Sequence, residues 1–318
     1  MTALSGKELS AADLGQRWVL RVRLSDGSAT DAVGWLTSVR SRDVEITTVD
    51  QTVQVIDRAD VLLAHRAPPA RGAPPPERVS TIELQRHSVS GWLALAEPLG
   101  EWTLRAAGGF TGRANSCHAV GDPGVPIAAA ADRVVEFARR HGIAPMAQVV
   151  TGSTEEQGLR SLGWIDTYSS VDVLATRLAD LLTNGPSPAG VRLTEELESS
   201  WWDAYQQSRP NNADPALLRM ILDGNPPRAF GSAGEQIFAI ARGHLSEDWL
   251  GLVSIWTHPD HRREGWATRL TTALGHWAAR RGARYAYLQA DVANQPALRI
   301  YQRLGFERHH GYLYLAPP

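Results

Sequence analysis

The 318-residue sequence predicts an α/β protein of mixed-sheet type, built from a duplicated unit and preceded by a small all-β domain. Three observations lead to this prediction. The N-terminal stretch alternates apolar and polar residues as short strands do. A segment rich in proline follows it. Two later regions then repeat the same order of amphipathic helix, glycine and apolar strand, which is the pattern of an internal duplication.

The N-terminal stretch predicts an all-β domain over residues 1–68. β-branched residues and tryptophan recur at every second position, and polar turns such as Ser25-Asp26-Gly27 separate the runs. The predicted strands are RWVLRVRL, AVGWLTSV, DVEITTV and TVQVI. Their number and length favour a small SH3-like barrel. The segment RAPPARGAPPPE cannot hold a helix or a central strand, so we expect a linker at residues 69–79.

The rest of the chain divides into two similar regions, 80–183 and 184–318. The motif Arg-Arg-His-Gly at 139–142 aligns with Ala-Arg-Arg-Gly at 279–282, an offset of 140 residues. The motif Leu162-Gly163-Trp164 aligns with Leu304-Gly305-Phe306 at an offset of 142. A nearly constant offset indicates duplication, although any two α/β units could share such landmarks. The Gly-Pro-rich run at 184–188 predicts the joint between the regions.

Net charge, hydrophobic run length and cysteine count limit the classes to which the protein can belong. The formal net charge of −2 disfavours a protein that binds nucleic acid through its overall charge. No apolar run is long enough to cross a membrane, and we expect a cytoplasmic protein. The single cysteine, Cys117, cannot form an internal disulfide, which agrees with a reducing compartment. The oligomeric state is left open by the sequence.

The stretch HPDHRREGWATRL, residues 258–270, has the composition of an anion-binding turn. It follows an apolar strand, WLGLVSIWTHP, and leads into a helix whose apolar face includes Leu270, Leu274 and Trp277. Free backbone N–H groups and the helix dipole favour anions at such a helix start. Residues 258–308 also carry nine Arg against four acidic residues. The turn therefore predicts a phosphate site, although an ordinary strand-to-helix connection explains R-x-x-G-x-A alone equally well.

A second motif, N-x-x-A-L-x-x-Y-x-x-L-G-F, begins at Asn294, a predicted helix N-cap. Together, and in this order, the two motifs resemble the GNAT superfamily of N-acetyltransferases. Arg262, Gly265 and Ala267 match its acyl-CoA motif Gln/Arg-x-x-Gly-x-Gly/Ala. The resemblance covers residues 235–318, and more weakly 80–178. The whole chain is similar to uncharacterised actinobacterial acetyltransferases that have two GNAT modules in tandem and an N-terminal barrel.

The resemblance implies acetyl transfer from acetyl-CoA to an amine, with acetyl-CoA as co-substrate and no metal. It implies Tyr301 as the general acid that protonates the departing thiolate. The implied cofactor-binding residues are Ile255, Trp256, Thr257, Arg262, Arg263, Glu264, Gly265, Trp266, Ala267, Thr268 and Asn294. The first region has Leu159 where the second has Tyr301 and lacks an Arg-x-x-Gly-x-Ala turn, so we expect a degenerate first module and a catalytic second one.

The sequence also departs from the family. Many members carry a Glu general base on a central strand, and the corresponding residues here are Gly251 and Gln289. Nearby candidates are Glu247, Asp248, Asp291 and His258, so the base is unassigned, and a water relay or an amine that arrives deprotonated would also serve. The glycine-rich segment TLRAAGGFTGRANS, residues 103–116, either lines the acceptor site or forms a structural bulge and turn.

Three functions agree with these observations. The first is an N-acetyltransferase acting on a small-molecule amine or a peptide. The second is a non-catalytic acyl-CoA-binding sensor, favoured by the missing glutamate. The third is an acetyltransferase for histone-like protein tails that uses the barrel for recognition. The sequence does not identify the acceptor.

Overall fold

A computed structural model describes residues 8–9, 17–48, 53–67, 75–92, 95–209, 214–224 and 227–318. The chain divides into two compact units. One consists of Met1–Ala73 with the short segments Asn225–Pro227 and Leu245–Asp248, and the other contains the remaining residues. Most of the predicted proline-rich linker lies outside the described residues.

The N-terminal unit is a five-stranded antiparallel sheet, which agrees with the predicted all-β domain. Its strands are β1 (Arg17–Arg23), β2 (Ala29–Val39), β3 (Asp43–Thr47), β4 (Val53–Asp57) and β5 (Val61–Arg66), in the order β4-β3-β2-β1-β5. The alternation read from the sequence places Trp18, Leu20 and Ile46 in its core. The last strand, β5, was not predicted. The sheet is compatible with an SH3-like barrel.

The second unit is organised around one large mixed sheet. Residues 81–184 form α1 (Thr81–Val89), η2 (Ser90–Trp92), β6 (Leu95–Leu99), β7 (Trp102–Ala106), η3 (Gly112–Ala114), β8 (Cys117–Ala119), α2 (Ile127–Arg140), β9 (Ala147–Val150), α3 (Thr154–Ser161), β10 (Ile165–Asp166), β11 (Val171–Arg177) and α4 (Leu178–Asn184). Residues 191–316 form β12 (Val191–Thr194), α5 (Ser199–Ser208), α6 (Pro215–Asp223), β13 (Arg228–Ala233), β14 (Ala239–Ser246), β15 (Trp249–Thr257), η4 (Pro259–His261), α7 (Trp266–Arg280), β16 (Tyr285–Asp291), α8 (Gln295–Arg303) and β17 (Glu307–Ala316).

The two regions repeat a strand–helix–strand–helix unit. In the first region β8 and β9 are parallel and are joined by α2, and α3 follows. In the second region β15 and β16 are parallel and are joined by α7, and α8 follows. Glycines at positive φ end α2, α7 and α8: Gly142, Gly282 and Gly305. The helices and strands predicted around the repeated motifs are confirmed.

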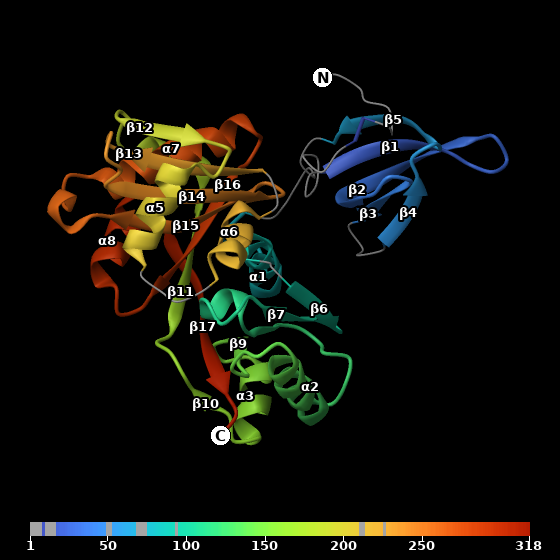
Figure 1. Cartoon of the computed structure of the whole chain (residues 1–318), viewed down its shortest axis with the longest axis horizontal. Helices are drawn as coiled ribbons and strands as arrows, with labels where there is room; N and C mark the ends of the chain where they lie inside the picture. Colours follow the sequence, from blue (N-terminus) through green and yellow to red (C-terminus); the bar gives the residue numbers. More distant parts are fainter. Residues whose placement is uncertain are drawn as a thin grey trace. The chain divides into compact units, whose positions relative to one another are not determined.

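The final strands of the two regions are exchanged. The sheet order is β12-β13-β14-β15-β16-β11-β17-β9-β8-β7-β6, and β10 pairs with β17. Strand β11 thus follows the helices of the first region but pairs along its whole length with β16 of the second. Strand β17 follows the helices of the second region but pairs with β9 of the first. Figure 1 shows β11 and β17 running between the two regions. The boundary proposed at residues 183/184 separates the repeats in sequence, whereas the sheet continues across it.

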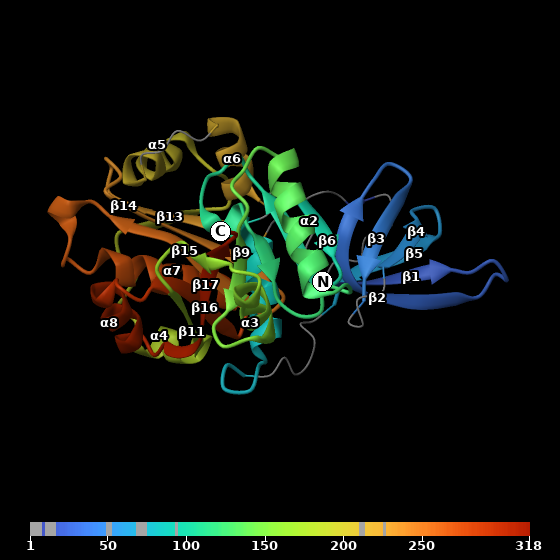
Figure 2. The ribbon, with the colours of Figure 1, turned by 90° about the horizontal axis from the view of Figure 1, so that it is seen from below.

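Helices cover both faces of the sheet in the second region. Helices α5 and α6 lie on one side of β13 and β14, and α4 and α7 lie on the other (Figure 2). Adjacent residues of β13 show the alternation, since Phe230 packs among the aromatic side chains of α5 and a Cβ on Gly231 would meet Leu270 of α7. No helix in the described part of the chain is long and apolar enough to span a membrane.

Candidate active site

The parallel strands β15 and β16 separate halfway along their length. Their pairing runs from Trp249 opposite Tyr285 to Leu252 opposite Leu288. Beyond this point β15 continues to Thr257 and β16 to Asp291 without further pairing between them among the described residues. Ser254 lies just past the last pair with φ of 55°, a left-handed conformation that breaks the extended geometry of a ladder. The separated strands expose backbone groups to a ligand.

A cavity of about 490 Å³ opens at this separation. Its size is within the range of small-molecule sites in proteins. Both regions of the chain contribute to its wall: Thr111, Gly112, Arg113, Tyr168 and Val171 from the first, and Arg209, Leu252, Val253, Ser254, Ile255, Leu288, Gln289, Ala290, Asp291, Asn294, Ala297, Tyr301, Tyr312 and Tyr314 from the second. Three of the residues predicted from sequence, Ile255, Asn294 and Tyr301, are therefore brought together here.

Two residues in a strained backbone conformation line this cavity. The described residues include four non-glycine residues at positive φ: Thr111, Glu247, Ser254 and Arg263. Thr111 and Ser254 line the cavity, and Arg263 lies in the turn before α7. Residues in such conformations cost about 1–3 kcal/mol each and are found most often at functional sites. The distribution of strain agrees with the location of the cavity.

The turn before α7 presents a row of unpaired backbone donors. Gly265 is the N-cap of α7 with φ of 85°, which a residue with a side chain adopts only with strain. Within the described part of the chain, the backbone N–H groups from Arg263 to Thr268 have no hydrogen-bond acceptor. Such a row at a helix N-terminus is the geometry that binds phosphate.

Side chains brace this turn. Arg262 Nε donates to the Thr257 carbonyl at 3.4 Å, and Thr268 Oγ1 donates to the Gly265 carbonyl at 2.6 Å. The Glu264 carboxylate accepts the Trp266 indole N–H at 2.9 Å, and this bond lowers the pKa of Glu264. Of the predicted residues on β15, Trp256 packs its side chain against the aromatic cluster of α5, so only its backbone faces the strand opening.

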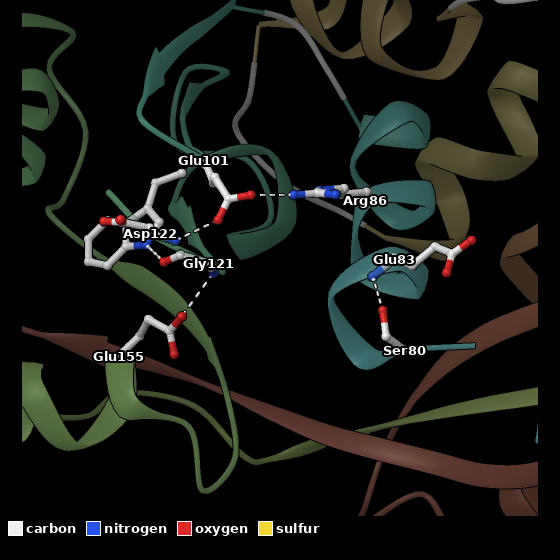
Figure 3. Close-up of polar contacts among 8 residues, drawn as sticks. Ser80, Glu83, Arg86, Glu101, Gly121, Asp122 and Glu155 are labelled. Atoms are coloured by element: carbon white, nitrogen blue, oxygen red, sulfur yellow. Dashed lines mark hydrogen bonds and ion pairs between the residues drawn. The ribbon is translucent and has the colours of Figure 1, made fainter. Parts of the chain in front are cut away.

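The corresponding loop of the first region, between β8 and α2, already holds carboxylates. Gly121 N–H donates to Glu155 Oε1 at 2.9 Å, and Asp122 N–H donates to Glu101 Oε2 at 2.8 Å (Figure 3). Arg86 in turn donates to Glu101 Oε1 at 2.6 Å. Leu159, at the position that corresponds to Tyr301, is buried in the hydrophobic core. The first region thus satisfies these donors with its own side chains.

Tyr301 lies on helix α8 and lines the cavity. Asn294 caps the helix as predicted, since its side chain accepts the Ala297 N–H at 3.3 Å. Tyr301 lies two turns further on, is 8% exposed and packs against Phe306. Burial raises the pKa of Tyr301 to about 12, so its phenol keeps its proton at neutral pH.

Residues 83–315 match the family described as "Probable histone acetyltransferase Rv0428c C-terminal". The chain belongs to this family. It is a GNAT N-acetyltransferase and therefore an acyltransferase enzyme.

The chain is also similar to individual known proteins. The chain is 25% identical over 241 residues to the "Uncharacterized N-acetyltransferase YobR" of Bacillus subtilis, covering 72% of this chain and 96% of that protein. A GCN5-related N-acetyltransferase from Kribbella flavida has the same fold with a TM-score of 0.54 and 19% identity, over 74% of this chain and 95% of that one. A tandem GNAT protein from the clavulanic acid biosynthesis pathway has a TM-score of 0.49 and 16% identity, over 63% and 74% of the two chains.

The packing around Gly251 leaves no room for the glutamate base that the resemblance implies at this position. A Cβ on Gly251 would lie 2.2 Å from His244 Cε1 and 2.6 Å from the Tyr287 hydroxyl. The His244 imidazole therefore occupies the space that a side chain at residue 251 would need. Gln289, the second such position, lines the cavity, and its Oε1 accepts from the Tyr312 hydroxyl at 3.4 Å.

Of the four candidate bases, only Asp291 is among the described residues that line the cavity. Its Oδ1 accepts the Ala293 N–H at 2.8 Å. His258 instead caps the short η4 helix, where it accepts the Asp260 N–H. Glu247 and Asp248 lie in the turn between β14 and β15, at the end of β15 opposite to the separation.

The segment 103–116 reaches the cavity through Thr111, Gly112 and Arg113. Asn115 organises this loop from within. Its Oδ1 accepts the N–H groups of Ala107 and Gly109 at 2.6 and 2.8 Å, and its Nδ2 donates to the carbonyls of Phe110 and Thr111. The segment is therefore both a structural turn and part of the cavity wall.

The aromatic side of the cavity was not predicted from the sequence. Tyr312 and Tyr314 come from β17, and Tyr168 comes from the connection between β10 and β11. The alternating GYLYLA pattern of β17 predicts a strand, but no local pattern indicates that this strand lies beside β9 and β11. Only the strand exchange brings these tyrosines to α8.

Proposed function

We propose that the second region binds acetyl-CoA and transfers its acetyl group directly to an amine in the cavity. The pyrophosphate would accept the backbone N–H groups from Arg263 to Thr268, next to the exposed Arg262 side chain. The pantetheine arm would pair with the free edge of β15 at Ile255 to Thr257. One observation carries this proposal. Along the chain, β15 separates from β16, lines the cavity and then leads into the turn whose backbone N–H groups have no acceptor.

We also propose that each chain binds only one acetyl-CoA. In the first region the Glu101 and Glu155 carboxylates occupy the donors that a phosphate would need, and they would repel its charge. Leu159 offers no proton to a leaving thiolate. These contacts support a first region that shapes the site rather than a second site.

In the proposed reaction the amine nitrogen attacks the thioester carbonyl carbon, and the carbon–sulfur bond breaks. A backbone N–H at the separated end of β15 would stabilise the oxygen that becomes negative. Tyr301 would donate its phenolic proton to the departing thiolate, so that CoA leaves as a thiol. The proton lost by the amine would pass through water, with Asp291 as the nearby carboxylate on the cavity wall. The products are CoA and an N-acetylated amine.

A protein acceptor is the second candidate. The family description names a probable histone acetyltransferase, and the N-terminal sheet would then act as a recognition unit. Acetylation of basic peptides by the full chain, lost on removal of residues 1–73, would favour this candidate over a small-molecule acceptor.

The substitution Tyr301→Phe tests the proposed chemistry. It keeps the ring that packs against Phe306 and removes only the proton donor. We expect turnover to fall by roughly 10²- to 10⁴-fold, with acetyl-CoA affinity and thermal stability almost unchanged. Tyr285→Phe is the matched control, because Tyr285 is 6% exposed and is not among the cavity-lining residues. Near-normal turnover in Tyr301→Phe would leave Tyr301 with a packing role only.

A further inference from the structure

We propose that the acceptor is an α-amino acid with an apolar or aromatic side chain, and that Arg113 binds its carboxylate. This inference rests on the proposed function and names the substrate class of the same site. It is carried by the charge and hydrogen bonding of the cavity wall, which neither the family nor the individual relatives specify.

Arg113 places a cation without a protein counter-ion at the cavity. Its Nε donates to the Tyr312 hydroxyl at 3.0 Å, and its guanidinium lies 5.6 Å from the Trp92 ring centre. No carboxylate among the described residues lies within ion-pair distance of it. A half-buried guanidinium that keeps its charge is stabilised when an anion binds it, because the cavity solvates the charge poorly.

The terminal Nη atoms of Arg113 are the part available to a ligand. Among the described residues they have no acceptor, and they are not buried atoms. Burial works against the charged form, but the neighbouring Tyr312 and Tyr314 raise the pKa of Arg113, so the guanidinium is charged. Two adjacent Nη donors match the two oxygens of a carboxylate.

Arg105 shows what a purely structural arginine looks like in the same region. It is 2% exposed, and its Nε and Nη2 donate to the Ser116 carbonyl and hydroxyl and to Gln148 Oε1, at 2.9 to 3.0 Å. Arg113 lies in η3, which follows the strand β7 that carries Arg105. Among the described residues, only its Nε has a hydrogen-bond acceptor, the Tyr312 hydroxyl. The contrast assigns the remaining donors of Arg113 to a ligand.

The opposite charge lies further along the same wall. The Tyr312 hydroxyl that accepts from Arg113 donates to Gln289 Oε1 at 3.4 Å. Gln289 and Asp291 are two residues apart on β16, so their side chains leave the strand on the same face. Arg113 and Asp291 thus contribute a cation and a carboxylate to the lining of one cavity, which suits a zwitterionic ligand.

Aromatic side chains supply the third part of the site. Tyr314 packs edge-on against both Tyr168 and Tyr312, with ring centres 5.6 Å apart in each pair. All three line the cavity. Their faces and edges offer apolar contact to the side chain of an amino acid, which selects apolar and aromatic residues over charged ones.

The test compares a carboxylate with its amide. N-acetyl-L-phenylalanine and N-acetyl-L-phenylalaninamide, the product analogue and its neutral counterpart, are titrated calorimetrically into the full chain, with and without saturating CoA. Hydrogen bonds to a charged group predict that the acid binds roughly ten- to a hundredfold more tightly than the amide. Arg113→Gln should abolish this preference, and Arg133→Gln, a change of an exposed arginine on α2, should retain it.

Kinetics give a second readout. With L-phenylalanine as acceptor, Arg113→Gln should raise KM for the amino acid and leave KM for acetyl-CoA nearly unchanged. Equal binding of acid and amide to the wild-type chain, or binding of neither, overturns the inference without any variant. A preference that persists in Arg113→Gln overturns it as well.

The outcome is distinguishable from failure of the proposed function. If CoA binds and neutral amines or peptides are acetylated but the acid has no advantage, only the amino-acid inference fails. If CoA itself does not bind, the proposed function fails, and the acid–amide comparison on the free chain still decides the role of Arg113.

Discussion

The substitution Gly251→Ala should destabilise the protein through one contact. Gly251 lies in the paired part of β15, opposite Tyr287. Its added Cβ would be 2.2 Å from His244 Cε1 and 2.5 Å from Nε2, distances at which atoms overlap. The backbone of Gly91 also lies close to this ring, since a Cβ on Gly91 would be 2.4 Å from His244 Cε1. The imidazole therefore packs closely against the backbones of two glycines, which leaves it little room to move.

The loss of unfolding free energy can be calculated from the displacement of the His244 ring. Overpacking a filled core costs about 1–3 kcal/mol. Displacing the ring also breaks the 2.9 Å hydrogen bond between His244 Nε2 and the Tyr287 hydroxyl, which adds about 1 kcal/mol. A total of about 2–4 kcal/mol corresponds to a fall in Tm of roughly 5–15 °C for a unit of this size.

Thermal and urea unfolding of four variants measure this effect. His244→Ala removes the obstructing ring, so Gly251→Ala should cost almost nothing in that background, giving a coupling free energy of at least about 1 kcal/mol. Gly243→Ala on β14 is the matched control, because its Cβ would meet only leucine side chains that can move, at 3.0 to 3.2 Å. An unchanged Tm for Gly251→Ala, or the same loss with and without His244, would refute the reasoning. The same overlap means that a glutamate base cannot be introduced at residue 251.

Three further predictions concern ligand binding, assembly of the sheet and pH. Gly265→Asp, which puts a side chain at φ of 85° and a negative charge in the turn before α7, should lower CoA affinity more than a hundredfold by calorimetry, and retained affinity would contradict the proposed pyrophosphate site. A fragment of residues 186–318 lacks β11 and should not unfold cooperatively, whereas residues 75–318 should, as circular dichroism can check. Burial lowers the pKa of His87 to about 4 and that of His244 to about 3, so the unfolded state binds more protons below the ordinary histidine pKa of 6.5. The free energy of unfolding should therefore fall as pH drops from about 6.5 toward 4, by about 1 kcal/mol per pH unit for each imidazole, and urea unfolding that is flat over this range would exclude the effect.

Local features of the sequence determined the elements and the side of the site where we propose that acetyl-CoA binds. Gly265 at the start of α7, the Asn294 cap and the position of Tyr301 on α8 depend on residues within a few positions of one another. Backbone conformation, capping and helical periodicity act over that range, so the sequence alone predicts them. The order of the repeated units follows from the same local patterns.

Tertiary structure decided the side of the cavity where we propose that the acceptor binds. The contact between Arg113 and Tyr312 joins residues 199 positions apart, and it exists because β17 pairs with β9 while β11 lies beside β16. Hydrophobic alternation predicts that a segment is a strand and which of its faces is buried. It does not predict which strand lies beside it, because many partner strands can form the same backbone hydrogen bonds. Likewise, the glycine at residue 251 has its reason in the His244 ring, which only the packed sheet brings against it.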